Sequence, residues 1–199
     1  MSVADTEFDR LFANNDDPWA MRQRWYEQRK RALLLASLPR PEYQSIFEPG
    51  CANGETSAVL AQRCRRLLCY DTAERAVALT REKLASVPHA SVEQGRLPGQ
   101  WPVGPFDLVV INELGYYLDA ADLARLIEAC RASLSDDGQV LACHWRAPIQ
   151  GCSLNGDAVH QHLGDGLGMA SLLEHREADF ILQLWGRDPR SVAQHEGLR

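Results

Sequence analysis

One stretch of this 199-residue chain decides the prediction of its fold: Phe47-Glu48-Pro49-Gly50-Cys51-Ala52-Asn53-Gly54-Glu55. The residues just before it, Gln44–Phe47, predict a strand, and Glu55–Arg66 predicts a helix. Small residues between a strand and a helix allow a tight turn and let the backbone approach a ligand closely. The stretch therefore predicts a strand, a ligand-binding loop and a helix in succession.

Strands and helices alternate along the rest of the chain. Further strands are predicted at Leu67–Tyr70, Ser91–Glu93, Asp107–Ile111 and Gln139–Cys143, and helices at Ala73–Leu84 and Leu123–Leu134. Such alternation is typical of an α/β protein with an open parallel sheet and helices on both faces. Near the end, Ser171–His175 and Phe180–Trp185 predict an antiparallel hairpin, because a short acidic turn separates them.

The two ends of the chain differ from this core. The first residues are expected to be frayed, and Asp17-Pro18 predicts the start of a helix over Trp19–Leu35, which ends before Pro39. We therefore expect an N-terminal helical cap at residues 1–40, a main domain at 41–187 and a polar tail at 188–199.

Composition limits the partners and the compartment. The net charge of −6 and the lack of a basic stripe argue against nucleic acid. No apolar run approaches the roughly 20 residues that span a bilayer, and Met1–Arg10 does not look like a secretory signal. Six cysteines without a C-x-x-C pair predict buried free thiols in a cytoplasmic protein. No ligand cluster surrounds His160 and His162, so no metal site is expected.

Two nucleotide-binding patterns can be compared with the loop. The dinucleotide fingerprint G-x-G-x-x-G, placed from Gly50, needs glycine where the chain has Ala52 and Glu55. The loop of S-adenosylmethionine-dependent methyltransferases has an acidic residue followed two positions later by G-x-G-x-G. Glu48, Gly50, Ala52 and Gly54 follow that spacing with one replacement, so the loop resembles this second pattern. An ordinary glycine-containing turn is the structural alternative.

Asp71 follows the predicted second strand, 17 residues beyond Gly54. A carboxylate at this strand end can accept both hydroxyls of a ribose, although Asp71-Thr72 could instead cap the next helix. Beyond the third strand, the main chain around Arg96 and Leu97 is expected at the adenine, because an arginine side chain cannot accept its amino hydrogen.

The fourth and fifth predicted strands deliver candidates for the chemistry. Glu113 could orient or deprotonate an amine, and Tyr116 and Tyr117 could wall the site or belong to the core. His144 is either a general base, a substrate contact or a packed histidine. The basic and aromatic first helix is either a solvated face or a lid over the ligand.

Several segments together resemble the NodS-like group of S-adenosylmethionine-dependent methyltransferases, over most of the chain. They are Asp17-Pro18-Trp19, Trp25-Tyr26-Glu27-Gln28-Arg29-Lys30, Phe47-Glu48-Pro49-Gly50-Cys51, Trp101-Pro102, Phe106-Asp107-Leu108-Val109-Val110, Glu113, Tyr116-Tyr117-Leu118 and His144-Trp145. The resemblance implies a Rossmann-like class I methyltransferase fold, with a seven-stranded, mostly parallel sheet whose last strand is antiparallel. It also implies that the N-terminal helix covers the cofactor.

The expected function is transfer of a methyl group from S-adenosyl-L-methionine to a small molecule, leaving S-adenosyl-L-homocysteine. N-methylation of an amino-sugar-like or other amine is expected first, because an amine with a free lone pair needs a general base less than a hydroxyl does. The alternatives are O-methylation of a hydroxyl, a nicotinamide-dependent reductase, and a non-catalytic protein that binds an adenosine ligand. The protein could act as a monomer or a homodimer.

The expected site contains two groups of residues. The catalytic group is Glu113, Tyr116 and His144. The cofactor-binding group is Trp19, Tyr26, Lys30, Glu48, Gly50, Cys51, Ala52, Gly54, Asp71, Thr72, Arg96, Leu97 and Asn112.

Overall fold

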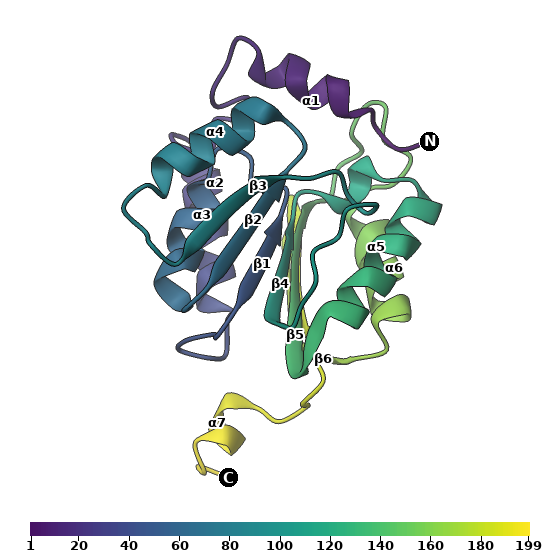
Figure 1. Cartoon of the computed structure of the whole chain (residues 1–199). Helices are drawn as coiled ribbons and strands as arrows, with labels where there is room; N and C mark the ends of the chain where they lie inside the picture. Colours follow the sequence, from purple (N-terminus) through teal and green to yellow (C-terminus); the bar gives the residue numbers. More distant parts are fainter.

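Seven strands form one sheet in the order β3-β2-β1-β4-β5-β7-β6 in the computed structural model, which describes residues 1–199 (Figure 1). Their bounds are β1 Ile46–Pro49, β2 Leu67–Asp71, β3 Ala90–Gln94, β4 Phe106–Asn112, β5 Leu134–Trp145, β6 Ala170–Arg176 and β7 Phe180–Gly186. Strands β1 to β5 pair in parallel, and β7 runs antiparallel to both β5 and β6. The predicted α/β class, the parallel sheet and the final antiparallel hairpin are confirmed.

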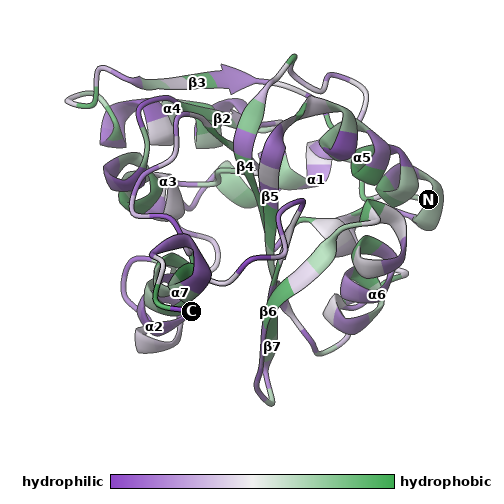
Figure 2. Cartoon of the chain, turned by 90° about the horizontal axis from the view of Figure 1, so that it is seen from below, coloured by the Kyte–Doolittle hydropathy of each residue, from purple (hydrophilic) through white to green (hydrophobic).

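Helices cover both faces of this sheet. The helices of the whole chain are α1 Asp5–Phe12, α2 Trp25–Ala36, α3 Glu55–Leu60, α4 Glu74–Lys83, α5 Ala120–Ser133, α6 Gly156–Leu167 and α7 Val192–His195, with short 3₁₀ turns η1 Ala61–Arg63 and η2 Gly115–Tyr117. The sheet lies between the layer of α2, α3 and α4 and the layer of α5 and α6 (Figure 2). Clusters of 20 and 17 buried apolar residues fill the space between the sheet and its two helix layers. This packing fixes the positions of the strand ends, which carry the polar side chains of the candidate site.

The first long helix begins later than predicted, at Trp25 rather than Trp19. Asp17 does accept hydrogen bonds, from the backbone N–H groups of Met21 and Arg22, but it closes a turn. Ala20 has φ of +57°, a left-handed conformation that cannot belong to a right-handed helix. The segment between Asp17 and Trp25 therefore wraps over the sheet edge instead of extending α2.

Three helices were not predicted: α1, α6 and the short α7 within the predicted polar tail. Helix α1 replaces the frayed start, because Phe12 is buried against Ala73, Ala76 and Leu79 at the start of α4. Figure 1 shows α1 lying across the edge of the sheet where the parallel strands end. Helix α6 lies between β5 and β6, begins at the N-cap Asn155 and ends at the left-handed Gly168. No helix is both long enough and apolar enough to cross a membrane.

Candidate active site

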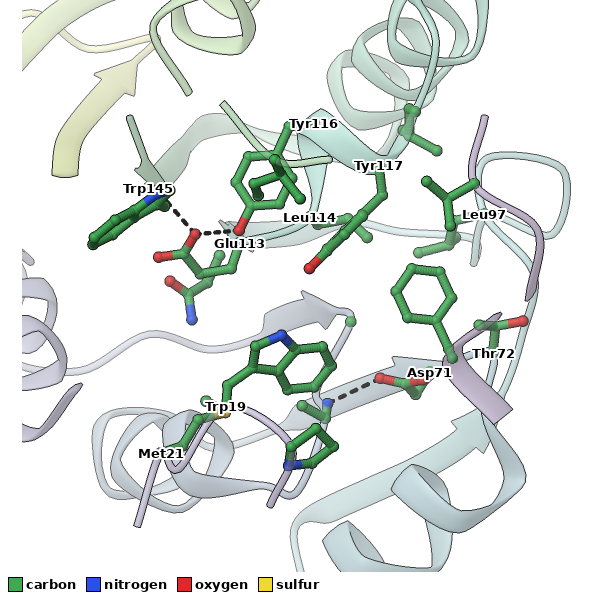
Figure 3. Close-up of a pocket in the computed structure, with 18 of the residues that line it drawn as sticks. Trp19, Met21, Asp71, Thr72, Leu97, Glu113, Leu114, Tyr116, Tyr117 and Trp145 are labelled. Carbon is green, nitrogen blue, oxygen red and sulfur yellow. Dashed lines mark hydrogen bonds between the residues drawn. The ribbon is translucent and has the colours of Figure 1, made fainter. Parts of the chain in front are cut away.

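A cavity of about 780 Å³ lies over the carboxyl ends of β1, β2 and β4 (Figure 3). The loops after these strands form its floor, and α1 with the segment before α2 forms its roof. It brings together twelve of the sequence-predicted residues: Trp19, Tyr26, Lys30, Gly50, Ala52, Asp71, Thr72, Arg96, Leu97, Asn112, Glu113 and Tyr116. Parallel sheets bind ligands at this edge, so the cavity is the candidate active site.

The loop after β1 exposes its backbone to the cavity. Gly50 has φ of +76°, and a Cβ there would meet the Leu114 side chain at 3.4 Å. Ala52 occupies the left-handed region with φ of +50°, although it carries a side chain. Its N–H donates to Asp71 Oδ2 at 2.9 Å and its carbonyl accepts from Thr80 Oγ1 at 3.0 Å, which holds this strained conformation.

Asp71 ends β2 and lines the cavity, with 9% of its surface exposed. Its two oxygens accept from Ala52 N–H and, at 3.0 Å, from Ala73 N–H. Burial raises the pKa of the carboxyl group to about 6, against the lowering effect of these backbone hydrogen bonds. Because a carboxylate offers about four lone-pair positions, it can still accept two hydroxyl hydrogens from the cavity side.

Three residues of the predicted loop set lie below the cavity rather than in it. Glu48 is 1% exposed, accepts a hydrogen bond from Ser57 Oγ, and has its pKa raised by burial to about 7. Cys51 is buried, and Gly54 packs against Thr80 with no room for a Cβ. Glu48 was expected in the cofactor-binding group, but it is buried beneath the cavity rather than part of its wall.

Asn112, at the end of β4, carries an orphaned polar atom. Its side chain lines the cavity and its Nδ2 lies 3.5 Å from Thr56 Oγ1. Its Oδ1 is buried and has no hydrogen-bond partner. Such an atom costs free energy unless a ligand donor reaches it, so Asn112 is a natural acceptor for an ammonium group.

Glu113 anchors a charged cluster beside Asn112. Its Oε1 lies 2.5 Å from Lys30 Nζ, and its Oε2 accepts from Trp145 N–H at 2.8 Å and from the Tyr116 hydroxyl (Figure 3). The backbone of Glu113 is left-handed, with φ of +53°. Strain of this kind costs about 1–3 kcal/mol and is concentrated at functional sites.

Lys30 serves this cluster and is not free for another anion. It is 4% exposed and also contacts Glu27 at 3.0 Å. Burial alone would lower the pKa of its ammonium group, but Glu113 and Glu27 outweigh that effect and raise this pKa above its usual value. Lys30 therefore remains protonated between two carboxylates, which leaves one net negative charge at this end of the cavity.

Aromatic side chains wall the cavity around the charged cluster. Tyr26 meets Trp145 edge to face at 5.6 Å, and its buried hydroxyl has no partner. From the other side, Trp19 packs on Phe12 at 5.6 Å. Tyr117 meets Phe8 of α1 at 5.0 Å, so it walls the cavity and is not only a core residue.

His144 was predicted in the site, but the structure places it behind the cavity wall, with 0% exposure. Its Nε2 accepts from Gly115 N–H at 3.0 Å, and its Nδ1 lies 3.0 Å from His160 Nε2. His160 in turn faces Gln183 Oε1 at 2.7 Å. Desolvation lowers the pKa of His144 well below its usual value, so the ring stays neutral and holds η2 in place.

The main chain around Arg96 and Leu97, in the loop after β3, was predicted to lie at the adenine. The N–H group of Arg96 already donates a hydrogen bond to Gln100 Oε1 at 2.7 Å. The Arg96 side chain forms an ion pair with Asp5 of α1. Leu97 lines the cavity as predicted.

Sequence reasoning missed Glu27, Asp5, Phe8 and His160 as parts of this neighbourhood. Glu27 had a local signal, since it lies three residues before Lys30 and thus on the same face of a helix. Asp5 and Phe8 had none, because α1 was not predicted. Asp5 and Phe8 line the cavity, and His160 lies behind it.

Comparisons with known proteins agree with this geometry. The family described as Nodulation protein S (NodS) matches residues 7–170. Nodulation protein S of Sinorhizobium fredii is 29% identical over 128 residues, which cover 63% of this chain and 59% of that protein. The match therefore spans less than two thirds of the length of this relative.

Two solved structures are similar to the chain. A candidate methyltransferase from Pseudomonas syringae is 60% identical, with a TM-score of 0.75 over 82% of this chain and 100% of that chain. The N-methyltransferase NodS from Bradyrhizobium japonicum, in complex with S-adenosyl-L-homocysteine, is 23% identical, with a TM-score of 0.83 over 93% and 98% of the two chains. The chain has the class I methyltransferase fold and belongs to the NodS family.

Proposed function

We propose that this protein is an S-adenosylmethionine-dependent methyltransferase that N-methylates an amine on a small molecule such as an amino sugar. One observation carries the proposal: a single cavity contains both the Asp71 carboxylate and the strained Glu113 cluster. The first suits the ribose of an adenosine, and the second suits an amine. Membership of the NodS family, with an N-methyltransferase among its solved structures, supports the same reading.

The residues present fit the cofactor. Asp71 would accept the ribose hydroxyls on the lone pairs that Ala52 and Ala73 leave open. The orphaned Asn112 Oδ1 would accept from the ammonium of the methionine portion. Gly50 and Ala52 would let the ligand lie against the backbone, above the buried carboxyl group of Glu48.

The bound cofactor would supply a methyl group that its sulfonium already activates. The protein must then orient an acceptor nitrogen with a free lone pair toward that methyl group. Glu113 would accept a hydrogen bond from the amine and take up the proton that an ammonium must lose before it can attack. Positioning of this kind can lower a barrier by about 7–11 kcal/mol.

The neighbours of Glu113 would hold it ready for this role. Lys30 would hold the Glu113 carboxylate through their ion pair, and Tyr116 and Trp145 N–H would fix its orientation. We propose a positioning role for His144 in place of the base role expected from sequence. Its ring would hold Gly115, and therefore η2 and Tyr116, in the conformation that reaches Glu113.

The N-terminal segment would act as the cap of the site. Val3 N–H donates to Tyr117 O at 2.8 Å, and Phe8 and Trp19 lie over the cavity. We therefore propose residues 1–40 as a cap that excludes water from the transferring methyl group, residues 41–187 as the catalytic domain and 188–199 as a peripheral tail.

Calorimetry tests the proposal directly. We expect S-adenosylmethionine and S-adenosylhomocysteine to bind with micromolar dissociation constants and NADH not to bind, because Ala52 and Glu55 break the dinucleotide pattern. A screen of small amines and their hydroxyl counterparts would follow, with methylated product measured by mass spectrometry. Binding of NADH alone, or of none of these ligands, would contradict the proposed function.

A further inference from the structure

The adenine end of the proposed cofactor site lacks an acceptor on the loop after β3. Beyond Asp71 the cavity continues between Thr72, Leu97 and Phe8, which offer mostly apolar walls for a flat ring. Arg96 carries only donors, and its N–H is already engaged by Gln100. The 6-amino group of an adenine would therefore find no side-chain acceptor on this loop.

Helix α1 brings a carboxylate to the same end. Asp5 is the first residue of α1, lines the cavity and has a side chain that is 27% exposed. Its Oδ2 pairs with Arg96 Nε, whereas Oδ1 has no partner within the protein. The ion pair holds the carboxylate against the loop next to Leu97.

The other carboxylates near this end are already committed. Asp122 receives Ser2 Oγ on one oxygen and Arg125 on the other. Asp71 receives backbone N–H groups on both oxygens and lies at the ribose position. Among these three carboxylates, Asp5 is therefore the one with an oxygen free to accept a hydrogen bond from adenine.

We propose that Asp5 accepts a hydrogen bond from the 6-amino group of adenine and makes this cap helix a determinant of cofactor specificity. The inference rests on the proposed function and deepens it. Arg96 would position Asp5 through the ion pair between their side chains. Asp5 precedes residue 7, where the family match begins, so this contact belongs to this chain's own N-terminal segment.

The proposal requires that Asp5 distinguish ligands by the amino group and not merely fasten α1. The test compares the dissociation constants of S-adenosylhomocysteine and of its analogue with purine in place of adenine, which lacks only the 6-amino group. Wild type should bind S-adenosylhomocysteine about 10- to 100-fold more tightly, the range of a hydrogen bond to a charged group. In Asp5→Ala this ratio should fall to within about 2-fold, because the acceptor is gone.

Two further variants separate recognition from fastening of the helix. Arg96→Gln removes the ion pair but keeps the Asp5 carboxylate, so both ligands should weaken and the ratio should fall by less than in Asp5→Ala. Glu7→Gln, on the same helix, is the matched control, because the half-buried Glu7 side chain pairs with Arg10 and not with the cavity loops. It should bind both ligands as wild type does.

Several results would overturn the proposal. A wild-type ratio near one, or an Asp5→Ala ratio equal to that of wild type, would show that Asp5 does not read the base. If both Asp5→Ala and Arg96→Gln weakened the binding of the two ligands by equal factors, the ion pair would only fasten α1 to the loop after β3. If wild type bound neither ligand, the proposed function itself would fail, which is a distinct outcome.

Discussion

The pH dependence of cofactor binding follows from the burial of Asp71. Desolvation raises the pKa of this carboxyl group from 3.8 to about 6, with partial compensation from the backbone N–H groups of Ala73 and Ala52. The shift favours the protonated form, so the group is neutral below about pH 6 and ionised above it. Ribose hydroxyls donate hydrogen bonds to the ionised form, so we predict that affinity for S-adenosylhomocysteine rises with pH through this window.

The size of the effect can be worked out from the pKa. With a pKa of about 6, roughly one tenth of the protein carries ionised Asp71 at pH 5 and roughly nine tenths at pH 7. Because apparent affinity scales with the competent fraction, the dissociation constant should be about 10-fold larger at pH 5. In Asp71→Asn, one backbone N–H loses its acceptor and the charge disappears, so affinity at pH 7.5 should fall about 10- to 100-fold.

Calorimetric titration with S-adenosylhomocysteine between about pH 5 and 8 is the assay, and Asp71→Asn should flatten the profile. Glu48 needs its own control, because its pKa is also raised, to about 7, by burial. Glu48→Gln should therefore keep the step that belongs to Asp71. A constant affinity from about pH 5 to 7, or wild-type affinity in Asp71→Asn, would refute the assignment of Asp71 to the ribose.

Four further predictions concern the loop and the charged cluster. Glu113→Gln should lower kcat by about 100-fold or more while cofactor affinity changes by less than about 3-fold, and an unchanged kcat would remove Glu113 from the chemistry. Lys30→Met leaves Glu27 and Glu113 uncompensated, so it should cost about 2–4 kcal/mol and lower the melting temperature by about 5–15 °C; a wild-type melting temperature would contradict this. Ala52→Gly relieves the left-handed backbone and should raise the melting temperature by about 1–4 °C, whereas a decrease would show that the residue is not strained. His144→Ala should lower kcat and stability without removing a step from the pH profile of kcat, since the buried ring is neutral; loss of a step near neutral pH would restore it as a base.

Much of the fold could be predicted because local signals agreed with the final packing. Strand β4 contains the apolar run Leu108–Ile111, and the structure buries these residues between both helix layers. Gly50, Ala52 and Asp71 line the cavity at the sheet edge where the sequence put the loop after β1 and the end of β2, because strand ends fix these positions in any open parallel sheet.

The parts that were missed depend on contacts between distant segments. Helix α1 has few apolar residues, and it is held by Phe12 on α4 and by Asp5 on Arg96, which lies 91 positions away. Lys30 was assigned to the cofactor because its partner Glu113 lies 83 positions along the chain. His144 could not be placed, because sequence does not tell which face of the end of β5 points into the cavity.

Turnover with methyl-labelled S-adenosylmethionine tests the central claim most directly, with a panel of small amines that includes amino sugars and their hydroxyl counterparts. The account predicts that label appears as a methyl group on nitrogen, with one S-adenosylhomocysteine formed per methyl group transferred. It also predicts that Glu113→Gln loses this turnover while it still binds the cofactor. Label on oxygen alone would contradict N-methylation. Tight cofactor binding with no methyl transfer to any acceptor would contradict both the methyltransferase activity and the catalytic role of Glu113.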